Sequence, residues 1–163
     1  MIFETERLIV RKLILDDLLS FHKMQSNPKV MRYVTGDVKS LQEHELELKE
    51  LMAKYDLPNN NFWIYAIDRK SDGEFIGTCA IVDEVNELGY RFLEQFWGLG
   101  YGKEICNGLI QYCKEIGLKL LTAYVVDKNI ASAKIIESNN FKVVKKFVSD
   151  DLKLPETKYE LYI

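Results

Sequence analysis

Short apolar segments alternate with polar ones along the chain, and their periods predict the order of its secondary-structure elements. Seven segments have the composition or alternation typical of strands, and they cover residues 8–10, 62–67, 75–82, 87–92, 120–126, 141–147 and 157–162. Four segments carry apolar residues at helical spacing, at residues 16–25, 40–55, 101–116 and 129–138. This order of strands and helices predicts an α/β fold with a mixed sheet.

Local signals set several boundaries of these elements. Asp16 is expected to cap the first helix, and Ser40 followed by Glu43 has the spacing of a capping box at the start of the second. Residues 71–73, Ser-Asp-Gly between two strand segments, predict a hairpin turn. Gly117 is expected to end the third helix.

The histidines and cysteines give no sign of a metal site. Cys79, Cys106 and Cys113 form an odd set without a CxxC spacing, which argues against a disulfide framework and a zinc site and predicts three buried thiols. His22 and His44 fall in the first two predicted helices without a partner motif, so we expect both to be exposed. We therefore expect no metal.

Length and composition place the chain among ordinary globular proteins. Its 163 residues are 47% hydrophobic and 29% charged, and without a repeat or linker they predict one domain over residues 1–163. A net charge of -3 disfavours a nucleic-acid partner and suits a cationic one better. The apolar runs are too short to span a bilayer and the N-terminus has no signal-peptide pattern, so we expect no membrane association and a cytoplasmic location.

The most informative segment is a glycine-rich stretch between a predicted strand and a predicted helix. Gly98, Gly100 and Gly102 let the backbone approach a ligand closely, and the free amides of a helix that begins near Tyr101 favour an anion. A pyrophosphate fits this description, although a turn needed only for packing has the same pattern. The motif GxxxxGK[ST] is absent, and no acidic residue stands where a dinucleotide fold requires one, so the common nucleotide-binding folds are disfavoured.

A second motif, N-x-x-S-x-x-(aliphatic)-x-E, opens residues 129–141. Together with residues 97–102, which match the signature Q/R-x-x-G-x-G/A, it resembles the GNAT superfamily of N-acetyltransferases. The resemblance covers essentially the whole chain and implies a mixed, mostly antiparallel twisted sheet of about seven strands flanked by about four helices. Three positions depart from the family pattern: Trp97 replaces a basic or amide residue, Asn140 replaces a glycine, and Ile136 stands where many relatives carry a tyrosine.

Within this superfamily, four further segments resemble the branch that acetylates ribosomal-protein alanine and serine residues. They are Thr5-Glu6-Arg7-Leu8, Asn27-Pro28-Lys29-Val30, Gly89-Tyr90-Arg91 and Trp97-Gly98-Leu99-Gly100-Tyr101. The resemblance implies direct acetyl transfer from acetyl-coenzyme A to a primary amine through a ternary complex, with peptide N-termini first and polyamines or aminoglycosides second. Tyr33 and Phe62 are expected near the acceptor entrance, and Trp63 either there or in packing. A non-catalytic acyl-coenzyme A binding or interaction domain, an unrelated anion-binding domain and a homodimer are left open.

The resemblance also assigns residues to the acetyl-coenzyme A site. Backbone groups of one strand are expected to pair with the pantetheine arm, because the next strand splays away: Tyr90, Arg91, Phe92 and Leu93. The pyrophosphate is expected at the segment that opens the third helix: Trp97, Gly98, Leu99, Gly100, Tyr101, Gly102 and Lys103. Lys103 and Lys134 would neutralise phosphates, while Asn129 and Ser132 would contact the cofactor unless they only cap the fourth helix.

Two side chains are expected to move protons. A lysine-like amine has a pKa near ~10.4 and arrives protonated, so a base must accept a proton before the nitrogen attacks. Glu87 is the expected base, acting through a bridging water, with Asp83 and Glu84 as substitutes and a solvated strand end as its alternative role. An amide near Phe92 would stabilise the oxyanion, and Ser132 would protonate the departing thiolate.

Overall fold

The computed structural model describes residues 1–163 and contains one eight-stranded sheet with the order β1-β2-β3-β4-β5-β6-β8-β7. All neighbouring strands are antiparallel except β5 and β6, which run parallel. The strands are β1 (Phe3–Glu4), β2 (Leu8–Lys12), β3 (Phe62–Arg69), β4 (Phe75–Val82), β5 (Glu87–Phe92), β6 (Leu120–Val126), β7 (Lys142–Val148) and β8 (Pro155–Tyr162). The predicted mixed, mostly antiparallel sheet is confirmed, and the two-residue β1 is the one strand that the sequence pattern does not predict.

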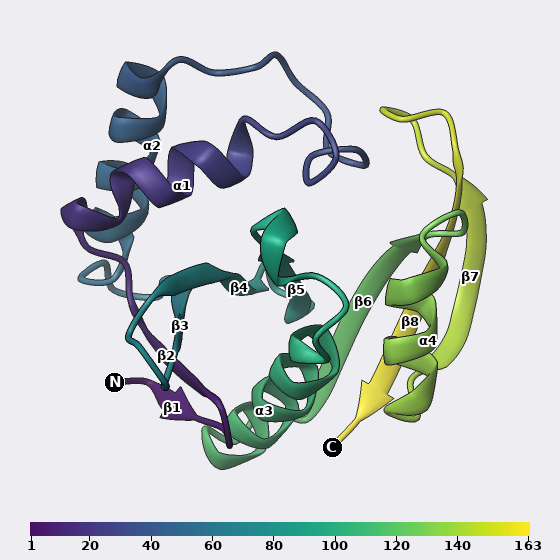
Figure 1. The fold of residues 1–163 in the computed structure, drawn as a ribbon. Coiled ribbons are helices and arrows are strands. Elements are labelled where there is room, and N and C mark those ends of the chain that lie inside the picture. Colours follow the sequence, from purple (N-terminus) through teal and green to yellow (C-terminus); the bar gives the residue numbers. More distant parts are fainter.

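Four α-helices flank the sheet, as predicted. They are α1 (Leu18–Gln25), α2 (Leu41–Lys54), α3 (Tyr101–Glu115) and α4 (Ile130–Ser138), with short 3₁₀ helices at Leu15–Asp17 and Glu94–Phe96. In Figure 1, α1 and α2 lie above β2 to β4, α3 lies below these strands, and α4 lies beside β6 to β8. None of the helices combines the length and the apolar character needed to cross a bilayer.

The helix boundaries agree with most of the local signals. The hydroxyl of Ser40 accepts the backbone N–H of Glu43 at 3.2 Å, which confirms the N-cap of α2. α3 ends at Glu115, and Gly117 follows with a φ of 87°, the left-handed conformation typical of a glycine stop. The turn predicted at residues 71–73 joins the antiparallel strands β3 and β4.

The N-cap expected of Asp16 is wrong. α1 begins only after the 3₁₀ turn, and it is the carboxylate of Asp17 that is fixed there. This carboxylate accepts the N–H of Ile14 at 2.9 Å and two N–H groups of the Arg11 guanidinium at 2.8 and 2.9 Å. Asp17, and not Asp16, is therefore the aspartate fixed at this turn. Its ion pair with Arg11 is a contact that the sequence pattern does not show.

The core lies between the sheet and the apolar faces of the helices. In α3 the buried residues Ile105, Leu109 and Cys113 recur every four positions, as the amphipathic pattern predicts. All three cysteines are free and buried, which confirms their predicted role. Burial raises the pKa of Cys106 and Cys113 to about 12, so these thiols are unreactive. No group of three or more His, Cys, Asp or Glu side chains is arranged to hold a metal ion.

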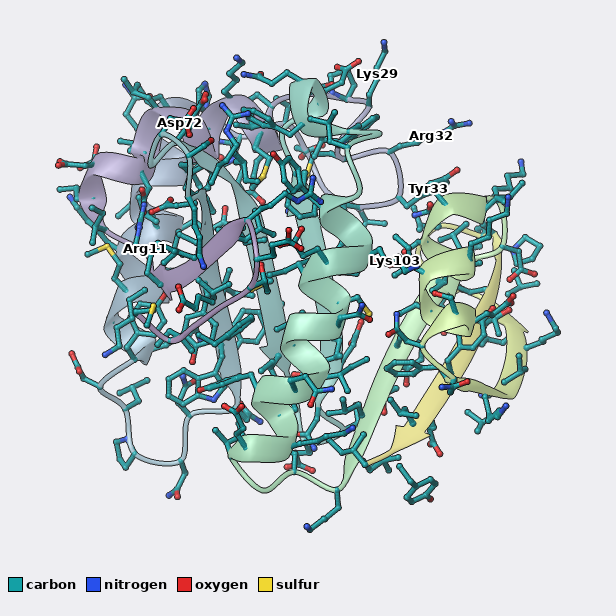
Figure 2. The ribbon with its side chains drawn as sticks, turned by 60° about the horizontal axis from the view of Figure 1, so that its bottom comes forward. Arg11, Lys29, Arg32, Tyr33, Asp72 and Lys103 are labelled. Atoms are coloured by element: carbon teal, nitrogen blue, oxygen red, sulfur yellow. The ribbon has the colours of Figure 1, made fainter.

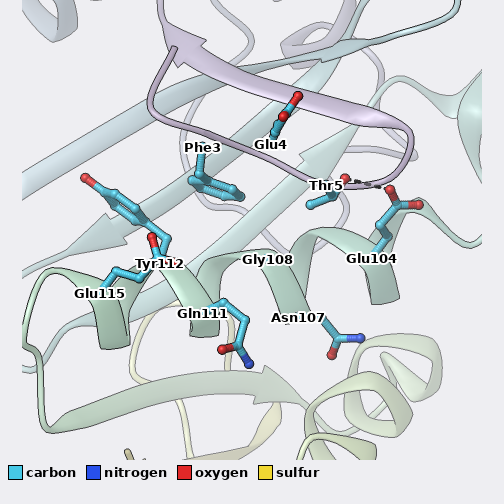
Figure 3. A pocket seen from close by; sticks show the side chains of 9 residues that line it. All are labelled: Phe3, Glu4, Thr5, Glu104, Asn107, Gly108, Gln111, Tyr112 and Glu115. Atoms are coloured by element: carbon cyan, nitrogen blue, oxygen red, sulfur yellow. Dashed lines mark hydrogen bonds between the residues drawn. The ribbon is translucent and has the colours of Figure 1, made fainter.

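β1 packs against α3 at a point where the helix needs a small residue. A Cβ atom at Gly108 would lie 2.7 Å from Cγ2 of Thr5 and 2.9 Å from Cε2 of Phe3. The Phe3 ring stacks on Tyr112 with the ring centroids 5.2 Å apart. Figure 3 shows these residues around a surface cavity of about 290 Å³ between β1 and α3. Gly108 therefore allows the N-terminal segment to dock on α3.

The expectation that both histidines are exposed is wrong, because His22 is half-buried and His44 is buried. The side chain of His44 is only 2% exposed, and its Nδ1 atom lies 2.7 Å from Nδ1 of His22 on α1. His44 precedes the buried residues Leu48 and Leu51 by four and seven positions, so it belongs to the apolar face of α2. Burial lowers the pKa of His44, and a hydrogen bond between two imidazoles requires one of them to accept through an unprotonated nitrogen.

We expect the protein to lose stability as the pH falls below ~6.5, where an unfolded histidine becomes protonated. Because the native pKa of His44 is lower, the unfolded state takes up more protons there, at a cost of at most about 1.4 kcal/mol per pH unit. Burial is the main cause of the lowered pKa; Lys39 and His22 add to it, and Glu43 and Glu47 oppose it. Melting curves of the wild type and His44→Gln across this range test the expectation. An unchanged pH dependence in the variant would contradict it.

Candidate functional site

β5 and β6 diverge at the centre of the sheet. The two parallel strands pair only through Glu87 and Thr122, where the N–H of Thr122 donates to the C=O of Asn86 at 3.2 Å. From there β5 continues to Phe92 against β4 alone. Figure 1 shows β6, β7 and β8 as a group set apart from β2, β3 and β4. One edge of β5 is therefore left without a strand partner.

The open edge of β5 presents backbone groups of Tyr90 and Phe92. The N–H of Leu93 donates to a β4 carbonyl at 2.9 Å, and since alternate residues of a strand bond to opposite sides, Arg91 also bonds toward β4. The C=O of Phe92 accepts the indole N–H of Trp97 at 3.0 Å. Fewer backbone groups are therefore free for a ligand than the four residues Tyr90 to Leu93 were expected to offer. The backbone of Arg91 and the N–H of Leu93 are hydrogen-bonded to β4 instead.

A turn with unbonded amides follows β5. Gly98 and Gly100 have φ angles of 73° and 83°, a left-handed conformation that glycine adopts without strain. Gly100 is the N-cap of α3, and no side chain caps this helix. The backbone N–H groups of residues 98–103 have no acceptor within the chain. These donors and the positive end of the helix dipole make the turn suited to an anion.

The N-terminal segment holds this turn in place. The Arg7 guanidinium donates to the C=O of Leu99 at 2.9 Å and to the carboxylate of Glu104 at 2.7 Å. The same carboxylate accepts the hydroxyl of Thr5 at 2.6 Å and the N–H of Arg7 at 2.7 Å. The Arg7 guanidinium also lies 4.5 Å from the centroid of the Tyr101 ring. Nothing in the sequence pattern predicts this brace between residues 92 to 99 positions apart.

Two exposed lysines lie on the helices that border the turn. Lys103 belongs to α3 and Lys134 to α4, and neither forms one of the ion pairs of the chain. Figure 2 shows Lys103 on the side of α3 nearest to α4. The two helices are close here, because a Cβ atom at Gly102 would lie 3.1 Å from Cδ1 of Ile135. Both lysines are thus available to a multiply charged anion.

The start of α4 brings two hydroxyl groups together. The side-chain oxygen of Asn129 accepts the N–H of Ser132 at 3.3 Å, so Asn129 caps the helix. The Ser132 hydroxyl lies 3.5 Å from the hydroxyl of Tyr90, at the outer limit of a hydrogen bond. Burial raises the pKa of Tyr90 to about 12, so it keeps its proton at neutral pH. Ile136, at the position where many relatives carry a tyrosine, lies in the core and is 3% exposed. The hydroxyl of Tyr90 is instead a candidate proton donor beside Ser132, and the sequence pattern does not predict it.

Glu87 is the most shielded of the three candidate carboxylates. It is partly buried at the start of β5, whereas Asp83 and Glu84 are exposed. Burial, and then the charges of Asp83 and Glu156, raise the pKa of Glu87. Thr122 lies opposite Glu87 on the neighbouring strand β6. Its side-chain hydroxyl is buried without a hydrogen-bond partner. An unsatisfied buried hydroxyl marks a place for a water molecule or a ligand atom.

A cavity of about 770 Å³ lies between the sheet, α1, α2 and the connection that joins these helices. The strand residues that line it include Phe62, Ile64, Thr78, Ala80, Gly89 and Arg91. Because side chains alternate along a strand, Glu87, Gly89 and Arg91 face one side of β5 and Tyr90 and Phe92 face the other. In Figure 1 the connection extends from α1 and α2 toward the side of the molecule where α4 lies.

Only one of the three residues expected at the acceptor entrance lines this cavity. That residue is Phe62. Trp63 stacks with Tyr55 and Tyr65, with ring centroids 6.3 and 6.1 Å apart, so it serves packing. Tyr33 lies in the connection with the guanidinium of Arg32 5.4 Å from its ring centroid, and Figure 2 shows both residues at the outer edge of the molecule.

A sheet that opens between two parallel strands, with an unpaired strand edge and a row of free amides at the next helix, suits an extended ligand with an anionic end. The chain belongs to the GNAT family of acetyltransferases, because the model of the Acetyltransferase (GNAT) domain matches residues 7–142. The resemblance found in the sequence is thereby confirmed, and the protein is an acetyl-coenzyme A-dependent N-acetyltransferase.

Three known proteins show how far the similarity extends. The uncharacterized N-acetyltransferase p20 of Bacillus licheniformis is 30% identical over 148 residues, which are 85% of this chain and 80% of that protein. RimL, a ribosomal L7/L12 alpha-N-protein acetyltransferase solved with coenzyme A, has a TM-score of 0.84 and 16% identity, covering 99% of this chain and 97% of that chain. The spermidine N-acetyltransferase of Vibrio cholerae, solved with coenzyme A and spermine, has a TM-score of 0.80 and 18% identity, covering 96% and 95%. At these identities the two structures establish a common fold only.

Proposed function

We propose that residues 1–163 form one transferase domain that moves an acetyl group directly from acetyl-coenzyme A to a primary amine in a ternary complex. The observation that carries this proposal is the position of β5, whose open edge and following turn suit one ligand while Gly89 and Arg91 line a cavity for another. Two ligands can therefore meet at one strand. A covalent enzyme intermediate on cysteine is disfavoured, because all three thiols are buried.

The donor side of the site comprises the β5 edge and the glycine turn. When bound, acetyl-coenzyme A supplies the thioester carbonyl that the amine attacks. The amides of residues 98–103 would hold its pyrophosphate, and Lys103 and Lys134 would neutralise its phosphates. Backbone groups of Tyr90 would pair with the pantetheine arm, and the N–H of Phe92 would stabilise the oxyanion. These assignments use the groups that the chain itself leaves unbonded.

On the acceptor side, Glu87 would accept the proton of the amine. Because its pKa is raised, the Glu87 carboxylate holds a proton more tightly than an exposed carboxylate does and is the stronger base. The unpartnered hydroxyl of Thr122 would bind a water molecule that relays the proton to Glu87. Asp83 and Glu84 are less suited, since both are exposed.

The departing thiolate would be protonated from the hydroxyl pair at α4. We expect Ser132→Ala to lower kcat by roughly tenfold to 10² and to change the Kd for coenzyme A little, because a leaving-group acid acts mainly in the transition state. Tyr90→Phe removes the neighbouring hydroxyl and should reproduce part of the loss. Steady-state kinetics and calorimetry measure the two effects.

Ser138→Ala is the matched control for these variants, because its hydroxyl lies on the same helix and donates to the C=O of Ile135 at 2.8 Å, at the far end from Ser132. It should retain normal kcat and Kd. Equal losses of donor affinity and kcat in Ser132→Ala would instead make Ser132 a cofactor contact without a role in proton transfer.

The acceptor itself is tested by a screen with detection of the released thiol. The panel contains peptides with N-terminal alanine or serine, because RimL is an alpha-N-protein acetyltransferase, and polyamines, because of the spermidine enzyme. We expect turnover with peptide N-termini. Stabilisation by acetyl-coenzyme A, about 2.7 kcal/mol at 100 times its Kd, without turnover of any amine would contradict the proposed transfer.

A further inference from the structure

Arg91 is the one arginine of the chain that is shielded from solvent without a carboxylate partner. Three other arginines bond to carboxylates, namely Arg7, Arg11 and Arg69, and Arg32 is exposed. The guanidinium of Arg91 makes one hydrogen bond within the chain, from Nη1 to the side-chain oxygen of Gln25 at 2.5 Å. A guanidinium has five N–H donors. Most of the donors of Arg91 are therefore without an acceptor.

No carboxylate around the cavity forms a hydrogen bond or ion pair with Arg91, although the charge of Glu47 acts on it. Glu47 lines the cavity too, but its carboxylate bonds to Lys39 at 2.8 Å. The remaining charged lining residues are Asp37 and Arg32, which lie exposed on the connection between α1 and α2 and carry opposite charges. The lining thus has an excess of one positive charge, on a chain whose net charge is -3.

A shielded guanidinium loses solvation that a bonded anion would restore. Burial lowers the pKa of Arg91, and the charge of Glu47 opposes this only in part; an arginine side chain remains protonated at neutral pH. The amide of Gln25 orients the guanidinium without neutralising it. The planar donors that remain match the two oxygens of a carboxylate or the oxygens of a phosphate.

We propose that the acceptor carries, besides its amine, an anionic group, a carboxylate or a phosphate, which Arg91 binds inside the cavity. This inference rests on the proposed transfer function and narrows the substrate class of the same site. Glu87 and Arg91 lie on one face of β5, four residues or about 13 Å apart, so the amine and the anionic group are recognised at separate points. An ω-amino acid, an aminoalkyl phosphate or a peptide with an acidic residue near its N-terminus satisfies this requirement, whereas a polyamine brings a cation to Arg91.

Matched acceptor pairs that differ only in the anionic group test the proposal. The pairs are an ω-amino acid with its carboxamide and an aminoalkyl phosphate with its amino alcohol, over a series of chain lengths. We expect the wild type to prefer the anionic member by about tenfold or more in kcat/KM, the scale of a hydrogen-bonded charge. The pair with the larger ratio identifies the anion.

Variants of two arginines show which residue causes the preference for anionic acceptors. Arg91→Gln should bring the ratio close to one without a change in the Kd for coenzyme A, and Arg91→Lys should retain part of it. Arg32→Gln is the matched control, since it removes the same charge from the exposed part of the lining and should leave the ratio unchanged. Melting curves verify that each variant is folded.

A wild-type preference for the uncharged members, or an equal ratio in Arg91→Gln, would overturn the proposal. Acceptor binding is also measured as a thermal shift in the presence of coenzyme A, which does not depend on turnover. If no acceptor releases thiol, the transfer function fails. Stabilisation by the anionic members that is lost in Arg91→Gln would still support anion binding by Arg91, and equal stabilisation of both proteins would overturn it.

Discussion

Replacing Glu87 by glutamine is expected to lower acetyl transfer at neutral pH by about 10² or more, the scale of a positioned general base. The substitution keeps the shape of the side chain and removes its basicity. Because burial and the charges of Asp83 and Glu156 raise the pKa of Glu87, the wild-type rate should fall as the pH drops through this raised value and the carboxylate becomes protonated. The rate of the variant should not show this fall at low pH. Its rate should approach that of the wild type at high pH, where free amine becomes abundant.

A pH-rate series on both enzymes, with saturating donor, measures this expectation. Asp83→Asn and Glu84→Gln are the controls, because they remove neighbouring carboxylates that are exposed. They should behave nearly as the wild type, and donor affinity should change little in all three variants. Parallel profiles with similar rates for the wild type and Glu87→Gln would show that Glu87 is only a solvated charge at the end of a strand and not the base.

Replacing Gly77 by alanine is expected to destabilise the protein by roughly 3 kcal/mol or more, at the upper end of overpacking effects. A Cβ atom at this position would overlap the carbonyl oxygen of Arg91 and lie 2.9 Å from Cδ1 of Phe92. The carbonyl belongs to the backbone of β5 and cannot move without breaking its pairing with β4. The melting temperature should therefore drop by about 6 to 12 °C.

Gly89→Ala provides the matched control in the same pair of strands. A Cβ atom there would meet the Cβ of Ala80 at 3.7 Å, an ordinary contact. Its melting temperature should stay near that of the wild type. If Gly77→Ala melted at the same temperature as Gly89→Ala, the close approach of β4 and β5 would not be the reason that position 77 is a glycine.

The periodic elements of the fold were predictable because each repeats its own signal over several residues. The unbroken run of aromatic and aliphatic residues at 62–67 and the four-residue spacing in α3 need no knowledge of the rest of the chain. β1 has only Phe3 and Glu4, too few residues to display a period, and it exists because it pairs with β2. His44 was misjudged by its polarity, although its spacing from Leu48 already placed it on the buried face of α2.

The candidate site was predictable where the backbone itself carries the signal. Gly98 and Gly100 mark a turn that other residues adopt only with strain, and the free amides follow from the start of α3. The role of the Arg91 side chain was not predictable in this way. Alternation along β5 separates Arg91 from Tyr90, but only the placement of α1 and α2 shows which side of the strand has the cavity.

The brace between Thr5, Arg7 and Glu104 has a consequence for the order in which the protein folds during synthesis. The hydrogen bonds of Thr5 to Glu104 and of Arg7 to Leu99 join residues 99 and 92 positions apart. At a translation rate of ~5 to 20 residues per second, the N-terminal segment waits roughly 5 to 20 seconds for its partners to emerge. β2 and β3 can pair in the meantime, so the N-terminal segment is already attached to the sheet when the glycine turn is made.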